Sequence, residues 1–159
     1  MLNRHGVEVI VPKKIRCCGS LNHHLGKEED AHQDFKNNIN TWYEEHKKGN
    51  LDAILSNTSG CGTTMKDYGF IFRDDKELSK KAKVISDLTR DISEYIFESL
   101  KLNIESKGKK YKVAYHSACS MQHGQKVHSQ PISLLEKTDN EIMETVSYTH
   151  LTLPTTAYV

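Results

Sequence analysis

Short β-branched runs alternate with amphipathic helical segments along most of this chain, and that alternation constrains the fold more than any other feature. Extended runs are predicted at 7–11, 51–57 and 111–116, each rich in apolar residues and closed by Pro or a polar residue. Strands that are separated by helices pair in parallel, through right-handed crossover connections. The predicted fold class is therefore α/β, a parallel-stranded sheet with crossover helices.

Apolar residues at steps of three and four define the helices between these runs. The first begins with acidic residues and ends with lysines, matching the helix dipole, and Gly49 supplies its stop. Asp91 and Glu94 have the spacing of a capping box, which marks the start of another helix. Helices are predicted over 27–48, 78–88 and 91–100 and from Ile132 onward, with a polar loop at 106–110.

All four cysteines follow predicted strands. The carboxyl ends of parallel strands lie along one edge of a sheet, where the connecting loops form a ligand-binding crevice. Small neighbouring residues and the helix N-termini that follow favour thiolate over thiol, and thiolate is the form that binds iron or zinc. The predicted metal ligands are Cys17, Cys18, Cys61 and Cys119.

The cysteines and the histidines near them also have other interpretations. Four cysteines can also be small buried apolar side chains, and their spacing matches neither a ferredoxin run nor a zinc ribbon. Adjacent cysteines bridge each other only with strain, so Cys17 and Cys18 fit paired ligands better than a disulfide. His116 and His123, on either side of Cys119, are weaker candidates that would hydrogen-bond to a cluster sulfur, the alternative being solvated loop histidines.

Composition excludes several classes of protein. The net charge is +1, which excludes the basic surface of a nucleic-acid-binding protein. No apolar run reaches the ~18 residues of a transmembrane segment, and the chain begins without an apolar leader, so a cytoplasmic protein with reduced thiols is expected. Walker, GxGxxG and Ser-His-Asp patterns are absent from the sequence. A hydrophobic content of 36% predicts a thin core, as in a subunit of a larger assembly.

The last fifteen residues differ from the rest of the chain. Residues 145–159 hold no charged residue and five threonines, whereas charged residues make up 27% of the whole sequence. A Thr-rich strand with a tail is one interpretation. The other is a non-native tail, because residues 146–156 closely resemble one reading frame of a transposon-end sequencing adapter. On the second interpretation, the natural protein continues past about Thr145.

Several motifs together resemble one family, the cysteine-rich CCG domain of oxidoreductase iron–sulfur subunits, and within it the iron–sulfur subunits of glycolate oxidase (glycolate dehydrogenase). The resemblance spans residues 1–144. Its motifs are Gly6-Val7-Glu8-Val9, Cys17-Cys18-Gly19, Gly60-Cys61-Gly62, Tyr68-Gly69, Asp91-Ile92-Ser93-Glu94, Ala114-Tyr115-His116, Cys119, Gln122-His123-Gly124-Gln125, Pro131 and Leu134-Leu135.

The resemblance implies a division of the chain and a function. Residues 1–105 would be the later part of a first CCG repeat, and residues 106–144 the start of a second. The chain would be a fragment of an electron-transfer subunit, inactive by itself, in a flavin-dependent 2-hydroxy acid dehydrogenase complex. Its [4Fe-4S] cluster would pass electrons from FAD in a partner oxidase subunit toward quinone, in the cytoplasm or on the inner face of the membrane.

Two alternatives remain beside this function. One is a zinc- or thiol-containing interaction domain, in which the same thiolates fold the loops. The other is the equivalent subunit of a lactate, glycerol-phosphate or heterodisulfide oxidoreductase.

Overall fold

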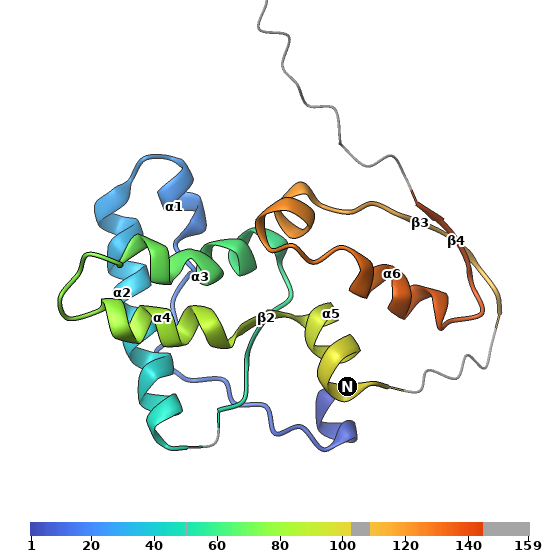
Figure 1. The fold of residues 1–159 in the computed structure, drawn as a ribbon, viewed down its shortest axis with the longest axis horizontal. Coiled ribbons are helices and arrows are strands. Elements are labelled where there is room, and N and C mark those ends of the chain that lie inside the picture. Colours follow the sequence, from blue (N-terminus) through green and yellow to red (C-terminus); the bar gives the residue numbers. More distant parts are fainter. Residues whose placement is uncertain (50, 103–108, 145–159) are drawn as a thin grey trace, which may run out of the picture.

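The computed structural model describes residues 1–49, 51–102 and 109–144, and Figure 1 shows the order of the elements. The helical elements are η1 (Leu2–His5), α1 (Ser20–His24), α2 (Glu28–Lys47), α3 (Ser59–Ile71), α4 (Ser79–Leu88), α5 (Ile92–Tyr95), η2 (Ile96–Leu100), η3 (Ser120–Gly124) and α6 (Ser129–Glu136). The strands are β1 (Ile54–Ser56), β2 (Thr89–Asp91), β3 (Lys112–Tyr115) and β4 (Glu141–Glu144). The expected tail at 145–159 and most of the expected loop at 106–110 lie outside the described residues.

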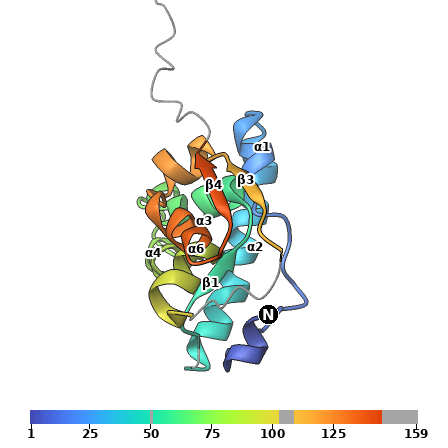
Figure 2. The ribbon, with the colours of Figure 1, turned by 90° about the vertical axis from the view of Figure 1, so that its right-hand side faces the viewer.

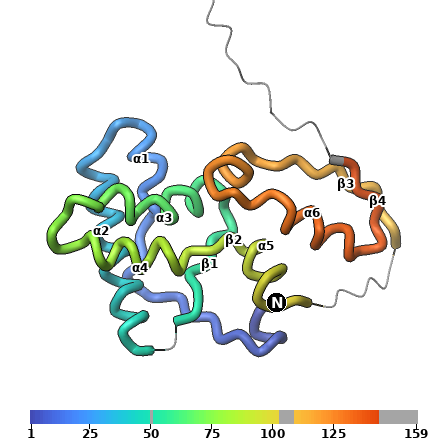
Figure 3. Tube along the Cα trace, viewed as in Figure 1, coloured from blue at the N-terminus to red at the C-terminus, as the bar shows by residue number. Residues whose placement is uncertain are grey.

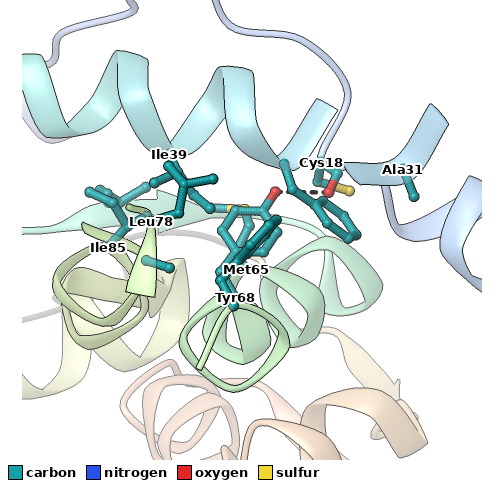
Figure 4. Packing of buried hydrophobic residues seen from close by; sticks show 11 residues of the cluster. Cys18, Ala31, Ile39, Met65, Tyr68, Leu78 and Ile85 are labelled. Atoms are coloured by element: carbon teal, nitrogen blue, oxygen red, sulfur yellow. Dashed lines mark hydrogen bonds between the residues drawn. The ribbon is translucent and has the colours of Figure 1, made fainter. Parts of the chain in front are cut away.

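The core lies among the three long helices α2, α3 and α4. In α2 and α4 the buried residues have the spacing that the sequence predicts, whereas no such stripe was predicted for α3. The side chains of Tyr68, Phe35, Ile39 and Ile85 are fully buried there. Figure 4 shows Ile39, Ile85 and Tyr68 among the side chains that meet between the helices, with Cys18 and Ala31 at the end of the cluster away from Leu78 and Ile85. Because burial of apolar surface is the main force that holds the helices together, this cluster positions everything attached to them.

The strands form two separate parallel pairs, so the α/β class and the parallel pairing are confirmed. β1 pairs with β2, and β3 pairs with β4. Figure 2 shows β3 and β4 side by side. The expectation that 51–57 and 111–116 share one sheet is wrong, because each pairs instead with a strand that the sequence pattern did not reveal. Three residues between two helices, as in β2, are too few to show a strand period.

The predicted strand at 7–11 is also wrong. The chain there is irregular and extended, as the tube in Figure 3 shows between η1 and α1. Val9, Ile10 and Val11 are 48%, 47% and 80% exposed. Strand propensity reflects the fit of β-branched side chains to a pleated, half-buried surface, and no strand in the described part of the chain pairs with this segment.

The predicted helices are confirmed, and so are their end signals. Gly49, just after α2, has φ +88°, the left-handed conformation that glycine adopts easily beyond a helix. Asp91 accepts a hydrogen bond from the backbone N–H of Ser93, and the Glu94 side chain accepts one from the backbone N–H of Asp91, which completes the capping box. Glu94 also binds Lys66 of α3 at 2.7 Å. The cap therefore ties α5 to α3.

The segment 109–144 packs against the first turns of α3 through two interlocking glycines. Gly62 leaves room for the Gln125 side-chain amide, which donates a hydrogen bond to the Ser59 carbonyl at 2.9 Å. Gly124 in turn leaves room for Thr63, whose hydroxyl lies 3.0 Å from the Ser120 carbonyl. A Cβ atom at either glycine would meet the opposing side chain at 2.6–2.8 Å. The loop that carries Cys119 is held against the helix that carries Cys61 by these contacts.

Two glycines with the same backbone conformation allow a matched test of the packing beside Cys18. Gly19 and Gly26 have φ +76° and +73°, but a Cβ at Gly19 would lie 2.4 Å from the Phe35 ring, whereas nothing lies within 4 Å of one at Gly26. Gly26→Ala should lower the free energy of unfolding by about 1 kcal/mol through backbone strain alone. Gly19→Ala should cost about 1–3 kcal/mol more, because it overpacks a buried ring.

Urea denaturation of the two variants and the parent measures both costs. Equal losses in the two variants would contradict the tight packing of Gly19 on Phe35.

Candidate functional site

The structure brings Cys18 and Cys61 together, although 43 residues separate them in the sequence. Their sulfur atoms are 2.8 Å apart, with the Cys18 thiol donating a hydrogen bond to the Cys61 sulfur. Cys18 is 9% exposed and packs at the end of the apolar core, and Cys61 is half-buried in the first turn of α3, just after β1. The carboxyl end of a short parallel strand therefore presents a thiol, as the sequence predicts for Cys61.

The backbone around the two adjacent cysteines is held by two buried polar side chains. Asn38 of α2, fully buried, accepts a hydrogen bond from the Arg16 N–H at 2.9 Å and donates one to the Cys17 carbonyl at 2.8 Å. The Tyr68 hydroxyl of α3 donates to the Cys18 carbonyl at 2.8 Å. Buried backbone groups need such partners, and here side chains supply what a neighbouring strand would otherwise provide. Both sulfurs thus rest on one rigid frame.

Cys18 is a thiol and not a thiolate in this environment. Burial, followed by the hydrogen bond to Cys61, raises the pKa of Cys18 from 9.0 to about 12, although a backbone hydrogen bond from Ser20 acts in the opposite direction. The backbone N–H of Ser20, at the start of helix α1, lowers the pKa of Cys18 in the direction that the sequence predicts. Desolvation by burial is the larger effect, so the net shift favours the thiol.

The structure does not gather the other predicted site residues into one ligand group with this pair. Cys17 and Cys119 are exposed, with Cys119 at the start of η3. His116, just beyond β3, and His123, in η3, are also exposed. Within residues 1–49, 51–102 and 109–144, no three His, Cys, Asp or Glu side chains come together in a way that could hold a metal ion. The described residues therefore assemble a two-thiol site, and a complete four-cysteine set is not gathered there.

Sequence reasoning did not identify Asn38, and it noted Tyr68 only as part of a family motif. A signal for Asn38 was present, because it lies three residues after Phe35, on the buried face of α2. A polar residue at a buried helical position needs a partner, and that requirement could have marked it. Its actual partners, the backbone groups of Arg16 and Cys17, could not be deduced without the fold.

Residues 1–66 match the family described as CCG, cysteine-rich domain. This first part of the chain is similar to the cysteine-rich CCG domain. The match includes Cys17, Cys18 and Cys61, so the thiol pair joins two segments of the matched region.

Proteins named as iron-sulfur proteins or as lactate utilization proteins are similar to most of the chain. The glycolate oxidase iron-sulfur subunit of Escherichia coli is 33% identical over 130 residues, which are 82% of this chain and 31% of that protein. Lactate utilization protein A of a Geobacillus species is 29% identical over 136 residues, 86% of this chain and 55% of the relative. An uncharacterized iron-sulfur protein of Methanococcus maripaludis is 36% identical over 137 residues, 86% of this chain and 24% of the relative.

These matches confirm the resemblance of the CCG domain and its flanking residues to iron–sulfur subunits of glycolate oxidase. The chain spans about a third of the length of the glycolate oxidase relative and about half that of the lactate utilization protein. No solved structure gives a significant match. Among the helices that the structure describes, none has the length and apolar character to cross a membrane.

Tyr68 provides a test of how the Cys18 backbone is held. Tyr68→Phe keeps the buried ring but removes the donor to the Cys18 carbonyl, and should lower the free energy of unfolding by about 1–2 kcal/mol. Tyr111→Phe is the matched control, because Tyr111 is 59% exposed and should change stability by less than about 0.5 kcal/mol. Urea denaturation in the presence of a thiol reductant measures both, and indistinguishable variants would argue against the hydrogen bond.

The raised pKa of Cys18 predicts how the stability of the metal-free chain depends on pH. A folded-state pKa above the unfolded value means that folding favours the protonated thiol. The contribution of the buried Cys18 thiol to the free energy of unfolding is complete below pH 9.0 and is lost as the pH rises toward about 12. The unfolding free energy of the parent should therefore fall more steeply above pH 9.0 than that of Cys18→Ala.

Cys17→Ala, at the exposed neighbour, should keep the steep dependence of the parent. Denaturation curves at several pH values under reducing conditions make this comparison. Parallel decline in the parent and Cys18→Ala would show that burial of Cys18 has no part in it.

Proposed function

We propose that this chain is part of the electron-transfer iron–sulfur subunit of a flavin-dependent 2-hydroxy acid dehydrogenase complex, with glycolate as the substrate of the partner subunit. The observation that carries the proposal is the meeting of Cys18 and Cys61 inside a CCG domain. Similarity to proteins named as iron-sulfur subunits supports it. An oxidoreductase-related role follows from these relatives, while the substrate, the flavin partner and the quinone acceptor are part of the proposal.

The cysteines are the proposed metal ligands, and they divide between two sites. Cys18 and Cys61, with the adjacent Cys17, would supply thiolates to one site in the CCG domain, which we propose extends to about residue 105. Cys119 would serve a second site in a repeat that begins near residue 106. His116 and His123, both exposed and close to Cys119 in sequence, would hydrogen-bond to ligands of that second site.

The described residues fit such a group only in part. An iron–sulfur cluster of the [4Fe-4S] type takes four cysteine thiolates, and the structure gathers two. The remaining ligands would come from the rest of a longer protein, since the chain spans about a third of its glycolate oxidase relative. When bound, a cluster of this kind accepts and releases single electrons. The chain's own contribution is the rigid frame of Asn38 and Tyr68 that presents the two sulfurs.

A second candidate function is a zinc- or thiol-containing interaction domain. The contact between two thiols without a third ligand nearby favours it. The relatives named lactate utilization protein A favour lactate as an alternative substrate of the partner subunits within the first proposal. In either case we place the protein in the cytoplasm, either free there or bound peripherally to the inner face of the membrane.

Mutants of the thiol pair in the intact complex test the electron-transfer proposal. Cys18→Ser and Cys61→Ser should each reduce turnover with quinone at least tenfold, because loss of a ligand removes the electron path. Reduction of the partner flavin by substrate should stay within twofold of the parent. His123→Ala, at an exposed position in η3, should change neither rate by more than about twofold.

Visible absorption and iron content of the same preparations separate the two candidates. An iron–sulfur cluster absorbs visible light, whereas a zinc site is colourless. Full quinone turnover and full iron content in both cysteine variants would rule out the cluster assignment. Colourless protein with bound zinc would support the interaction domain instead.

A further inference from the structure

The contact between Cys18 and Cys61 is closer than a shared metal ion would allow. Two thiolates on one tetrahedral zinc, each at about 2.3 Å from the metal, are held about 3.8 Å apart. The observed separation of the two sulfurs is 2.8 Å. In a disulfide bond the two sulfurs are about 2.05 Å apart. To form one, the sulfurs must move closer together, by a smaller distance than the one by which a shared zinc ion would separate them.

Both cysteines are held in this contact by the surrounding fold. The Cys18 carbonyl is bound by the Tyr68 hydroxyl, and Tyr68 lies two turns after Cys61 on the same helix, α3. On the other side, Gly19 packs in a left-handed conformation against the buried Phe35 ring. The two sulfurs therefore meet because α2 and α3 are packed, and they stay at high effective concentration for as long as the core is folded.

The surroundings of the pair also select these two thiols over Cys17. Cys17 is exposed, and a disulfide between Cys17 and the adjacent Cys18 would be strained. Cys61 is half-buried and can be reached from solvent, whereas Cys18 is buried behind it. One accessible thiol backed by one buried thiol is the arrangement of a reactive cysteine and its resolving partner.

We propose that Cys18 and Cys61 form a reversible intramolecular disulfide in the metal-free CCG domain, by exchange with a low-molecular-weight disulfide such as oxidised glutathione. The Cys61 sulfur, having lost its proton to solvent, attacks one sulfur of the external disulfide and releases the first thiol. The Cys18 sulfur then attacks the Cys61 sulfur of the mixed disulfide, its proton passes to the departing sulfur, and the second thiol is released. The two protein thiols lose two electrons and two protons, and the external disulfide gains both as two thiols.

This disulfide controls access of metal to the domain. With the bond closed, neither sulfur is available as a thiolate ligand, and reduction restores both together. The disulfide does not depend on whether the bound metal is iron or zinc, so it stands apart from the electron-transfer function proposed above.

Peptide mapping of the metal-free chain tests the bond directly. The protein is equilibrated in mixtures of reduced and oxidised glutathione, free thiols are alkylated, and tryptic peptides are analysed by mass spectrometry. Cys18 and Cys61 should lose alkylation together, at one glutathione ratio, and appear as a linked pair of peptides covering residues 17–27 and 49–66. Cys119 should stay alkylated at that ratio.

Cys17→Ser is the matched control, because residues 17 and 18 share one peptide. This variant should form the linked pair at the same ratio as the parent, which assigns the bond to Cys18. Cys18→Ser should instead leave Cys61 alkylatable or joined to glutathione, with no linked pair.

Three outcomes would overturn the proposal in the parent protein itself, without reliance on any variant. They are a bond between Cys17 and Cys18, stable glutathione adducts on Cys61 with Cys18 still alkylatable, or full alkylation of both thiols in excess oxidised glutathione. Iron content and quinone turnover do not enter this measurement, so its failure and that of the proposed function are distinguishable.

Discussion

The side chain of Tyr68 connects the apolar core to the backbone of the thiol site, and most of the arrangement around Cys18 depends on it. Its ring is fully buried and lies 5.0 Å from the Phe35 ring, centroid to centroid, so it joins α3 to α2. Its hydroxyl binds the Cys18 carbonyl. Burial of the Tyr68 ring stabilises the packing of α2 on α3, and the hydroxyl of the same side chain holds the Cys18 backbone against these helices. The position of the Cys18 sulfur relative to Cys61 is thus set by helix packing.

The segment that leads into this site is held by side-chain hydrogen bonds and not by pairing with a strand. Residues 7–11 have strand-forming side chains but no ladder partner among the described strands, and they run over the surface. Closer to the site, the Asn38 side chain hydrogen-bonds both backbone groups of Arg16 and the carbonyl of Cys17. One Asn side chain can bind all three groups because its NH2 donates and its carbonyl oxygen accepts, as the N–H and C=O of a peptide unit do. The thiol site is consequently attached to α2 and α3, and not to the edge of a sheet.

Local sequence signals account for the helices and for one half of the site. Acidic and basic residues at the ends of α2, the glycine after it, and the Asp91 capping box act within a few residues, so they are visible without the fold. The position of Cys61 after a strand and in the first turn of a helix follows from the same kind of pattern. The strands β2 and β4 escaped detection because short strands are defined by their partners, and those partners are distant in sequence.

The sequence by itself determined the α/β class, the long helices α2 and α4 with their apolar stripes, and the candidate thiols, because periodicity and cysteine placement are local properties. Only the tertiary structure decided that Cys18 meets Cys61 while Cys17 and Cys119 remain exposed. It also raises the pKa of Cys18, since burial against the core outweighs the backbone hydrogen bond from Ser20 in the short helix that follows. Both outcomes depend on desolvation and contact between segments more than 40 residues apart, which no local pattern specifies.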